Sequence, residues 1–166
     1  MLALLLQERG LGGRGEDLAA RLDRWKGERG ARAEASRKLA ARWSKRASEL
    51  ADNREDDAPP LGILLAEAYP DGSARRRDAS GERWLTAGGR GLRLDPASSL
   101  ARAGWLAVGE AQGEAKGARI TGAIALDEAE VTRWLGHRIE RRSTLRWIAD
   151  EGRVEALLEA RLGAIT

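Results

Sequence analysis

The fold available to this chain is constrained most by a change of residue pattern near Gly81. Before this point, apolar residues recur at the three- and four-residue spacing of helices, as Leu18, Leu22 and Trp25 do. After it, apolar residues come in short runs separated by glycine-rich turns, which is typical of strands. The pattern predicts a helical first part followed by a β-rich second part.

Two short helices are predicted in the first part. One begins with Glu16 and Asp17 in its first turn, because carboxylates favour the positive end of the helix dipole, and it ends at Gly27. The other covers 61–69 and follows the polar break 52–60.

The longest helical pattern lies between them and covers about 31–51. Leu39, Trp43 and Leu50 fall within about 40° of one another on a helical wheel, so they are expected to form its buried seam. Arg42 and Lys45 lie on the flank of that seam.

The β-rich part consists of short apolar runs with one helix among them. The expected strands lie near 84–85, 92–94, 105–108, 118–126, 138–148 and 154–165. A helix is expected over 128–135, with Asp127 as its N-cap. Strands interrupted by one short helix are the order of an oligonucleotide-binding (OB) barrel. The predicted fold class is therefore α+β: a helical N-terminal segment over 1–57, then an OB-type small β-barrel with one capping helix over 58–166.

No catalytic centre can be assembled from the sequence. Cysteine is absent, and His137 is the only histidine, without a partner base or a set of metal ligands. The run Gly88–Gly91 lacks the lysine and the hydroxyl residue of a phosphate-binding loop and is better explained as a hairpin turn. We therefore expect no cofactor and no metal in this chain.

The composition also favours a cytoplasmic protein. The apolar run 2–6 is too short to span a bilayer and lacks the features of a signal peptide. The absence of cysteine fits a reducing compartment.

Basic clusters carry more functional information. Between Arg24 and Arg46 there are nine basic and two acidic residues, a local charge of +7. Arg75–Arg77 and the group Arg138, Arg141, Arg142 and Arg146 repeat the pattern. Such clusters attract phosphate backbones without reading sequence. Any one of them alone is better explained by a solvated surface, and it is the three clusters flanking an expected OB barrel that favour nucleic acid.

Tryptophan side chains are a second candidate for contact with nucleic acid, because unpaired bases stack on them. Trp25, Trp43 and Trp134 lie on apolar stripes and are predicted to be in the core. Trp84 and Trp105 lie in expected strands and can face either way.

Several segments together resemble a known family. The segment 64–71 and the following Ala-Arg-Arg-Arg at 74–77 are similar to the AYPDRIARRRG stretch of the bacterial HrpB-type ATP-dependent helicases, in the DEAH/RHA group. The likeness continues through 81–91, 105–108, 118–120 and 126–129, and in the Arg-Leu-Gly-Ala of 161–164. Gly72-Ser73 and Ala87-Gly88 depart from the family pattern.

The resemblance implies that 1–57 is the end of a helical ratchet domain and that 58–166 is an OB domain, truncated on its C-terminal side. It further implies that these parts help the helicase ATPase domains to hold single-stranded RNA or DNA. The ATPase motifs that would bind ATP and Mg²⁺ do not occur in this sequence.

Two hypotheses follow. In the first, the chain grips single-stranded nucleic acid, and the residues expected to contact phosphates are Arg75, Arg76, Arg77, Arg83, Arg90, Lys116 and Arg119, with Arg42 and Lys45 on the long helix. In the second, the chain is a protein-interaction module that docks on the helicase core or on an acidic partner and touches RNA little.

Overall fold

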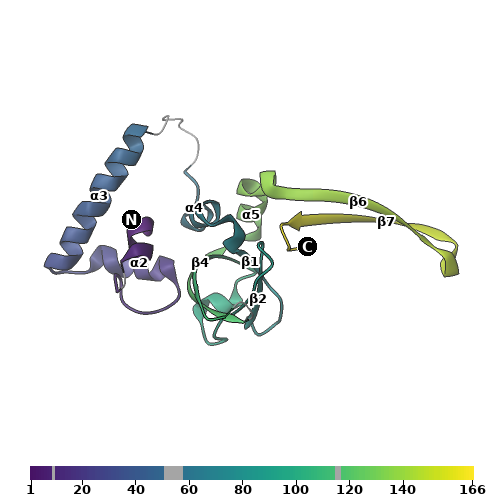
Figure 1. The fold of residues 1–166 in the computed structure, drawn as a ribbon, viewed down its shortest axis with the longest axis horizontal. Coiled ribbons are helices and arrows are strands. Elements are labelled where there is room, and N and C mark those ends of the chain that lie inside the picture. Colours follow the sequence, from purple (N-terminus) through teal and green to yellow (C-terminus); the bar gives the residue numbers. More distant parts are fainter. Residues whose placement is uncertain (9, 51–57, 115–116) are drawn as a thin grey trace.

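The structure, a computed structural model, describes residues 1–8, 10–50, 58–114 and 117–166 (Figure 1). Four helices come first: α1 (Leu2–Gln7), α2 (Leu18–Gly27), α3 (Ala31–Leu50) and α4 (Leu61–Ala68). A barrel of short strands follows, then helix α5 (Glu128–Trp134) and a long hairpin, β6 (Ile139–Ile148) and β7 (Arg153–Leu162). The predicted α+β class is confirmed.

Helix α2 begins at Leu18, two residues later than the sequence pattern suggests. Asp17 is its N-cap and not part of its first turn, because the carboxylate accepts hydrogen bonds from the backbone N–H groups of Ala19 and Ala20, each at 3.0 Å. Trp25 is fully buried in the helical core, as predicted.

The predicted seam of α3 is wrong in its outer half. Trp43 is 40% exposed and Leu50 is 81% exposed, whereas the buried positions are Ala33, Ser36 and Ala40. These small residues permit a close approach only over the first half of the helix. Every residue from 41 to 50 is exposed, so none of the large apolar side chains in this half of the helix is buried.

Five strands form a closed barrel in the order β1-β2-β3-β5-β4. They are β1 (Ser73–Arg76), β2 (Arg83–Thr86), β3 (Gly91–Arg93), β4 (Trp105–Gln112) and β5 (Ala118–Leu126). Only β3 and β5 pair in parallel, and the other four pairings are antiparallel. The interior holds Trp84, Leu92, Leu106 and Ile120, closed by Leu100 from the short 3-10 helix η2 (Ser99–Arg102).

Strand β1 was not expected from the sequence, which places Arg75 and Arg76 before the first strand. Its residues show no apolar alternation, and only Ala74 belongs to the interior cluster. The strand forms because it pairs with β2 on one side and with β4 on the other, which closes the barrel.

A second apolar cluster lies outside the barrel and joins it to the helices. Helix α4 packs against β4 and β5, and Gly62 permits this because a Cβ there would overlap the side chain of Leu126. Val131 and Leu135 bring α5 into the same cluster. One side of the barrel is therefore covered by helices.

The hairpin forms a two-stranded sheet of its own and projects away from the barrel (Figure 1). All ten residues of each strand pair in register, so 156–160 is a strand, as predicted. The barrel strands all lie within 73–126, so the hairpin adds to the predicted 58–166 unit without entering the ring.

The turn after β7 fixes the hairpin to the barrel. Ala164 donates a backbone hydrogen bond of 2.8 Å to the carbonyl of Ala87, and Gly163 has φ +59°. Because a Cβ at Gly163 would overlap that carbonyl oxygen, alanine is excluded there by contact as well as by conformation.

We expect Gly163→Ala to lower the free energy of unfolding by about 2 kcal/mol or more, measured by urea denaturation. Gly152→Ala is the matched control, because Gly152 has the same φ of +59° with no atom near its Cβ position. Gly152→Ala should lower the free energy of unfolding only by the cost of placing alanine at a positive φ, about 1 kcal/mol. Equal decreases in the free energy of unfolding for the two variants would contradict the role of Gly163 in anchoring the hairpin.

A candidate nucleic-acid interface on the barrel

Four arginines stand side by side across the outer surface of the barrel. Arg83 pairs with Arg93 between β2 and β3, and Arg93 pairs with Arg119 between β3 and β5. Arg77 extends the line from β1, because its backbone N–H donates to the carbonyl of Arg83 at 2.8 Å. We call these four residues the arginine row. All four are exposed.

The arginine row follows from strand geometry. Residues opposite one another in paired strands point to the same face, and their neighbours along each strand point to the other face. Trp84, Leu92 and Ala118 therefore point into the barrel while the arginines point out. Across four strands the row spans three strand spacings, roughly 14 Å.

The next outward-facing residues along these strands leave a hollow beside the arginine row. Leu85 pairs with Gly91. Gly117, the residue before β5, lies beside Gly91, and its backbone N–H donates a hydrogen bond of 3.2 Å to the Gly91 carbonyl. Because two of these three residues have no side chain, they leave a shallow hollow of about 450 Å³. Arg77, Arg83 and Arg93 line it.

Two carboxylates hold part of the row in place. Arg83 Nε donates to Asp78 Oδ2 at 3.0 Å, and Arg93 Nε donates to Glu82 Oε1 at 3.1 Å. The side chains of Arg77 and Arg119 have no hydrogen bond or ion pair with another described residue. The row thus contains two oriented guanidinium groups and two that are available.

This arrangement suits a chain of phosphates. Like charges on directly opposite strand positions repel one another. Asp78 and Glu82 offset this repulsion at Arg83 and Arg93, so Arg77 and Arg119 are the positions at which an approaching anion relieves it most. Guanidinium groups bind phosphate oxygens through paired N–H donors. The neighbouring hollow leaves room for the sugar–phosphate chain to approach the barrel surface.

Arg75 and Arg76, both predicted to contact phosphates, are held in contacts within the protein. Arg75 lies 5.3 Å over the Trp105 ring and donates to the carbonyl of Thr166 at 3.1 Å. Arg76 is half-buried and donates to the carbonyls of Ala101 and Arg102. The structure therefore separates these two side chains from the arginine row.

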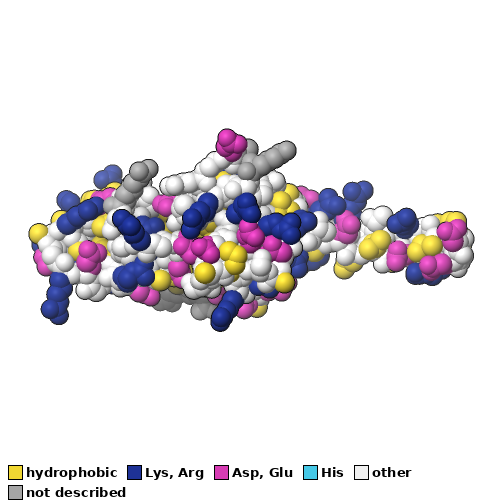
Figure 2. Space-filling view, turned by 90° about the horizontal axis from the view of Figure 1, so that it is seen from below, with side chains coloured by type: hydrophobic (Ala, Val, Ile, Leu, Met, Phe, Trp, Pro, Cys, Tyr) yellow, Lys and Arg dark blue, Asp and Glu magenta, His cyan; other side chains and the backbone are white. Residues whose placement is uncertain are grey.

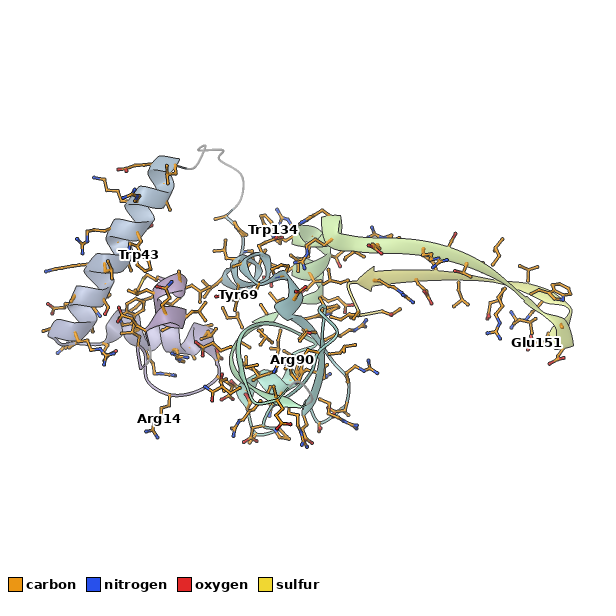
Figure 3. The ribbon with its side chains drawn as sticks, in the orientation of Figure 1. Arg14, Trp43, Tyr69, Arg90, Trp134 and Glu151 are labelled. Carbon is orange, nitrogen blue, oxygen red and sulfur yellow. The ribbon has the colours of Figure 1, made fainter. Side chains whose placement is uncertain are left out.

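The other predicted residues are distributed over the molecule. Arg90 is exposed in the β2–β3 turn and donates to the carbonyls of Gly113 and Glu114, so it ties two loops together at the barrel edge (Figure 3). Arg42 and Lys45 lie on α3, apart from the barrel. Lys116 lies outside the described residues.

Arg93 was missed by the sequence reasoning, although a signal for it was present. In a hairpin whose turn is centred on residue 88, two residues face one another when they lie equally far before and after residue 88, so that their numbers add up to 176. Arg83 and Arg93 satisfy this rule. The alternation Leu92-Arg93-Leu94 already placed Arg93 on the outer face.

Tryptophans do not add stacking surfaces to the row. Trp84 is 1% exposed and Trp105 is 8% exposed, so both face the two apolar clusters. The exposed tryptophans, Trp43 and Trp147, lie on α3 and on the hairpin. The row can therefore hold phosphates but has no exposed indole beside it.

The remaining candidates for chemistry have structural roles. His137 is exposed, with Nδ1 3.1 Å from the carbonyl of Trp134 and Nε2 3.8 Å from Glu67, as expected of a capping surface residue. Arg138, the residue before β6, donates to the carbonyls of Ala66 in α4 and of Pro70 after it, and so ties the start of the hairpin to this helix. No group of three or more potential metal ligands gathers among the described residues.

Positive charge over the molecule as a whole is interrupted by carboxylates. On the face shown in Figure 2, basic side chains alternate with acidic ones and form no continuous field. This agrees with a net charge of only +3 for 166 residues. Alignment of a few arginines, and not total charge, is what distinguishes the barrel surface.

None of the helices in the part of the chain described by the structure has both the length and the apolar character needed to cross a membrane.

Comparison with known proteins points to one group. The chain is 31% identical over 131 residues to the ATP-dependent RNA helicase HrpB of Escherichia coli strain K12, which covers 75% of this chain and 16% of that protein. A crystal structure of the E. coli DExH-box NTPase HrpB matches 99% of this chain and 19% of its own, with 26% identity and a TM-score of 0.73. A second crystal structure, of the E. coli DEAH/RHA helicase HrpB, matches the same shares with a TM-score of 0.68. No protein-family model matches.

These similarities confirm the resemblance seen in the sequence. This chain is homologous to one segment of HrpB-type helicases and spans about a fifth of their length or less.

The carboxylate that holds Arg83 gives a pH-dependent prediction. Desolvation raises the pKa of Asp78, but hydrogen bonds from the Arg83 side chain and backbone, and from Ser80 and Glu82, outweigh it, so the pKa lies below its ordinary value. A lowered carboxyl pKa stabilises the fold above the unfolded-state pKa, near 4, and the contribution disappears as pH falls through the folded-state pKa.

Asp78→Asn should therefore lower the free energy of unfolding at pH 7, and its difference from the unmodified chain should shrink below about pH 4. Chemical denaturation across this pH range measures the difference. A difference that stays constant down to strongly acidic pH would contradict the assignment.

Proposed function

We propose that this chain, homologous over nearly all of its length to one segment of the HrpB-type helicases, is the nucleic-acid-binding accessory unit of such a helicase. The arginine row holds the phosphates of single-stranded RNA. The observation that carries this proposal is the register that aligns Arg77, Arg83, Arg93 and Arg119 on the side of the barrel that helices leave uncovered.

The chemistry of the row determines the mode of binding. Contacts to phosphates contribute affinity and position without reading bases. Since the neighbouring tryptophans are buried, base stacking adds little on this face. Binding is therefore independent of sequence and sensitive to salt.

In this proposal, other parts of the helicase hydrolyse ATP. The relative bears the name of an ATP-dependent RNA helicase, and this chain contains no phosphate-binding loop. ATP and Mg²⁺ would be bound by the ATPase domains, which are the protein partner of this unit. The unit itself acts in the cytoplasm, where it holds single-stranded RNA or DNA.

The alternative is that the chain docks on the helicase core and touches RNA little. Charge reversal at Arg75–Arg77 is a poor discriminator, because Arg75 and Arg76 make contacts within the protein. Arg77 and Arg119 are better positions, because their side chains support no other described residue. Charge reversal there separates a loss of RNA binding from a loss of folding.

We expect the triple variant Arg77→Ala, Arg93→Ala and Arg119→Ala to bind a labelled single-stranded RNA at least about tenfold more weakly at low salt. The slope of log K against log salt should fall by about 2, because each lost phosphate contact to a single strand removes about 0.7. Fluorescence anisotropy titrations at several salt concentrations measure both quantities.

Arg46→Ala is the matched control for the single variant Arg93→Ala, because each removes one charge and Arg46 is exposed on α3, away from the barrel. This change should leave the salt slope almost unaltered. If removal of Arg46 weakens binding as much as removal of Arg93, or if the unmodified chain does not bind RNA at low salt, the arginine row is not the binding surface.

A further inference from the structure

The β6–β7 hairpin has two chemically different faces. Residues opposite one another in the ladder share a face, so the pairing of Trp147 with Val154 and of Leu145 with Ala156 determines which side chains gather. One face carries Leu145, Trp147, Val154, Ala156, Leu158 and Ala160, and we call these residues the apolar hairpin face. Arg141 and Ser143, which pair with Ala160 and Leu158, lie on the same side nearer the base of the hairpin.

The opposite face carries charges that match across the ladder. Glu140 faces Arg161, Arg142 faces Glu159, and Arg146 faces Glu155. Opposite charges at directly facing positions stabilise a strand pair in water. This face requires no partner.

The apolar hairpin face, by contrast, is covered only at its base. Leu162 and Ile139 pack against the outer cluster of the barrel. Further out, Leu145 is 74% exposed, Leu158 is 75% exposed and Trp147 is 61% exposed. An isolated two-stranded hairpin is marginally stable in water unless it packs on another surface. Contiguous apolar side chains of this kind mark interaction sites.

We propose that the apolar hairpin face docks on an apolar strip of the helicase body, the part of an HrpB-type chain that this sequence does not include. The inference rests on the proposed function. The matched crystal structures contain this segment, hairpin included, within a chain about five times as long, since 99% of this chain corresponds to 19% of theirs. In those proteins the segment is thus covalently joined to a body several times its own size.

The size of the face favours this occupant over a second copy of the chain. Ten residues at about 3.3 Å give a length of roughly 33 Å, and two strands give a width of roughly 10 Å, hence on the order of 300 Å². A stable association of separate proteins buries about 800 Å² on each partner. A smaller contact suffices within one polypeptide, because the covalent connection raises the effective concentration.

Two adjacent leucines provide a matched test. Leu158 lies on the apolar hairpin face, and Leu157 lies on the opposite face, where it pairs with Thr144. Both are exposed. Leu158→Glu and Leu157→Glu are made in the 166-residue chain and in a complete helicase in which this sequence replaces the matching segment of E. coli HrpB. Thermal unfolding is measured for all variants.

Leu158→Glu should lower the Tm of the complete helicase by at least about 2 °C and leave the Tm of the 166-residue chain unchanged, because only docking buries Leu158. Leu157→Glu should change neither. Equal effects of the two substitutions in the complete helicase, or an equal shift in both proteins for Leu158→Glu, would overturn the docking proposal.

Two further measurements separate the remaining outcomes. Sedimentation of the 166-residue chain should show a monomer, and a dimer that Leu158→Glu dissociates would assign the face to a second copy. RNA binding by the 166-residue chain should be unaffected by Leu158→Glu. If Leu158→Glu abolished RNA binding, the apolar hairpin face would be assigned to the nucleic acid. If the arginine-row variants bound RNA as tightly as the unmodified chain, that result would overturn the proposed function and not the docking proposal.

Discussion

The parallel pairing of β3 with β5 is the interaction on which the architecture depends. It consists of two residue pairs, Leu92 with Ala118 and Arg93 with Arg119, and it closes a ring that otherwise contains only antiparallel neighbours. The first pair places apolar side chains in the interior, and the second places two arginines outside. Closure of the barrel and alignment of the arginine row are thus consequences of the same register.

The distribution of apolar surface determines which face remains for a ligand. The outside of β4 and the end of β5 are covered by α4, and the second apolar cluster extends from there to α5 and the base of the hairpin. Within the described part of the chain no helix packs against β2 or β3, and the outer face of these strands and of the start of β5 carries the arginines. The interior residues Trp84 and Leu92 stabilise the strands that hold these like charges together. The apolar hairpin face is a second uncovered surface, of opposite chemical character.

Much of this organisation was predictable from local patterns. The strand alternation at Leu92-Arg93-Leu94 and the turn at Gly88–Gly91 indicate a hairpin in which Arg83 and Arg93 face one another. The likeness to HrpB-type helicases implies a helical first part followed by a barrel, and the structure contains both.

Other features depend on contacts between distant parts of the chain. The proximity of Arg93 and Arg119 requires the parallel register, which no local pattern shows. Arg75 and Arg77 look equivalent in sequence, but Trp105 and the carbonyl of Thr166 hold only Arg75. Periodicity on α3 predicted a buried Trp43, and it failed because burial needs a neighbouring surface that the described residues do not provide along 41–50.

Hydrogen–deuterium exchange of the 166-residue chain, with and without a single-stranded oligouridylate at low salt, tests the arginine row most directly. The account predicts slower exchange on RNA addition in the peptides that carry 77–93 and 117–119, with little change along α3. Protection confined to α3 or to the hairpin, with the barrel strands unchanged, would contradict it.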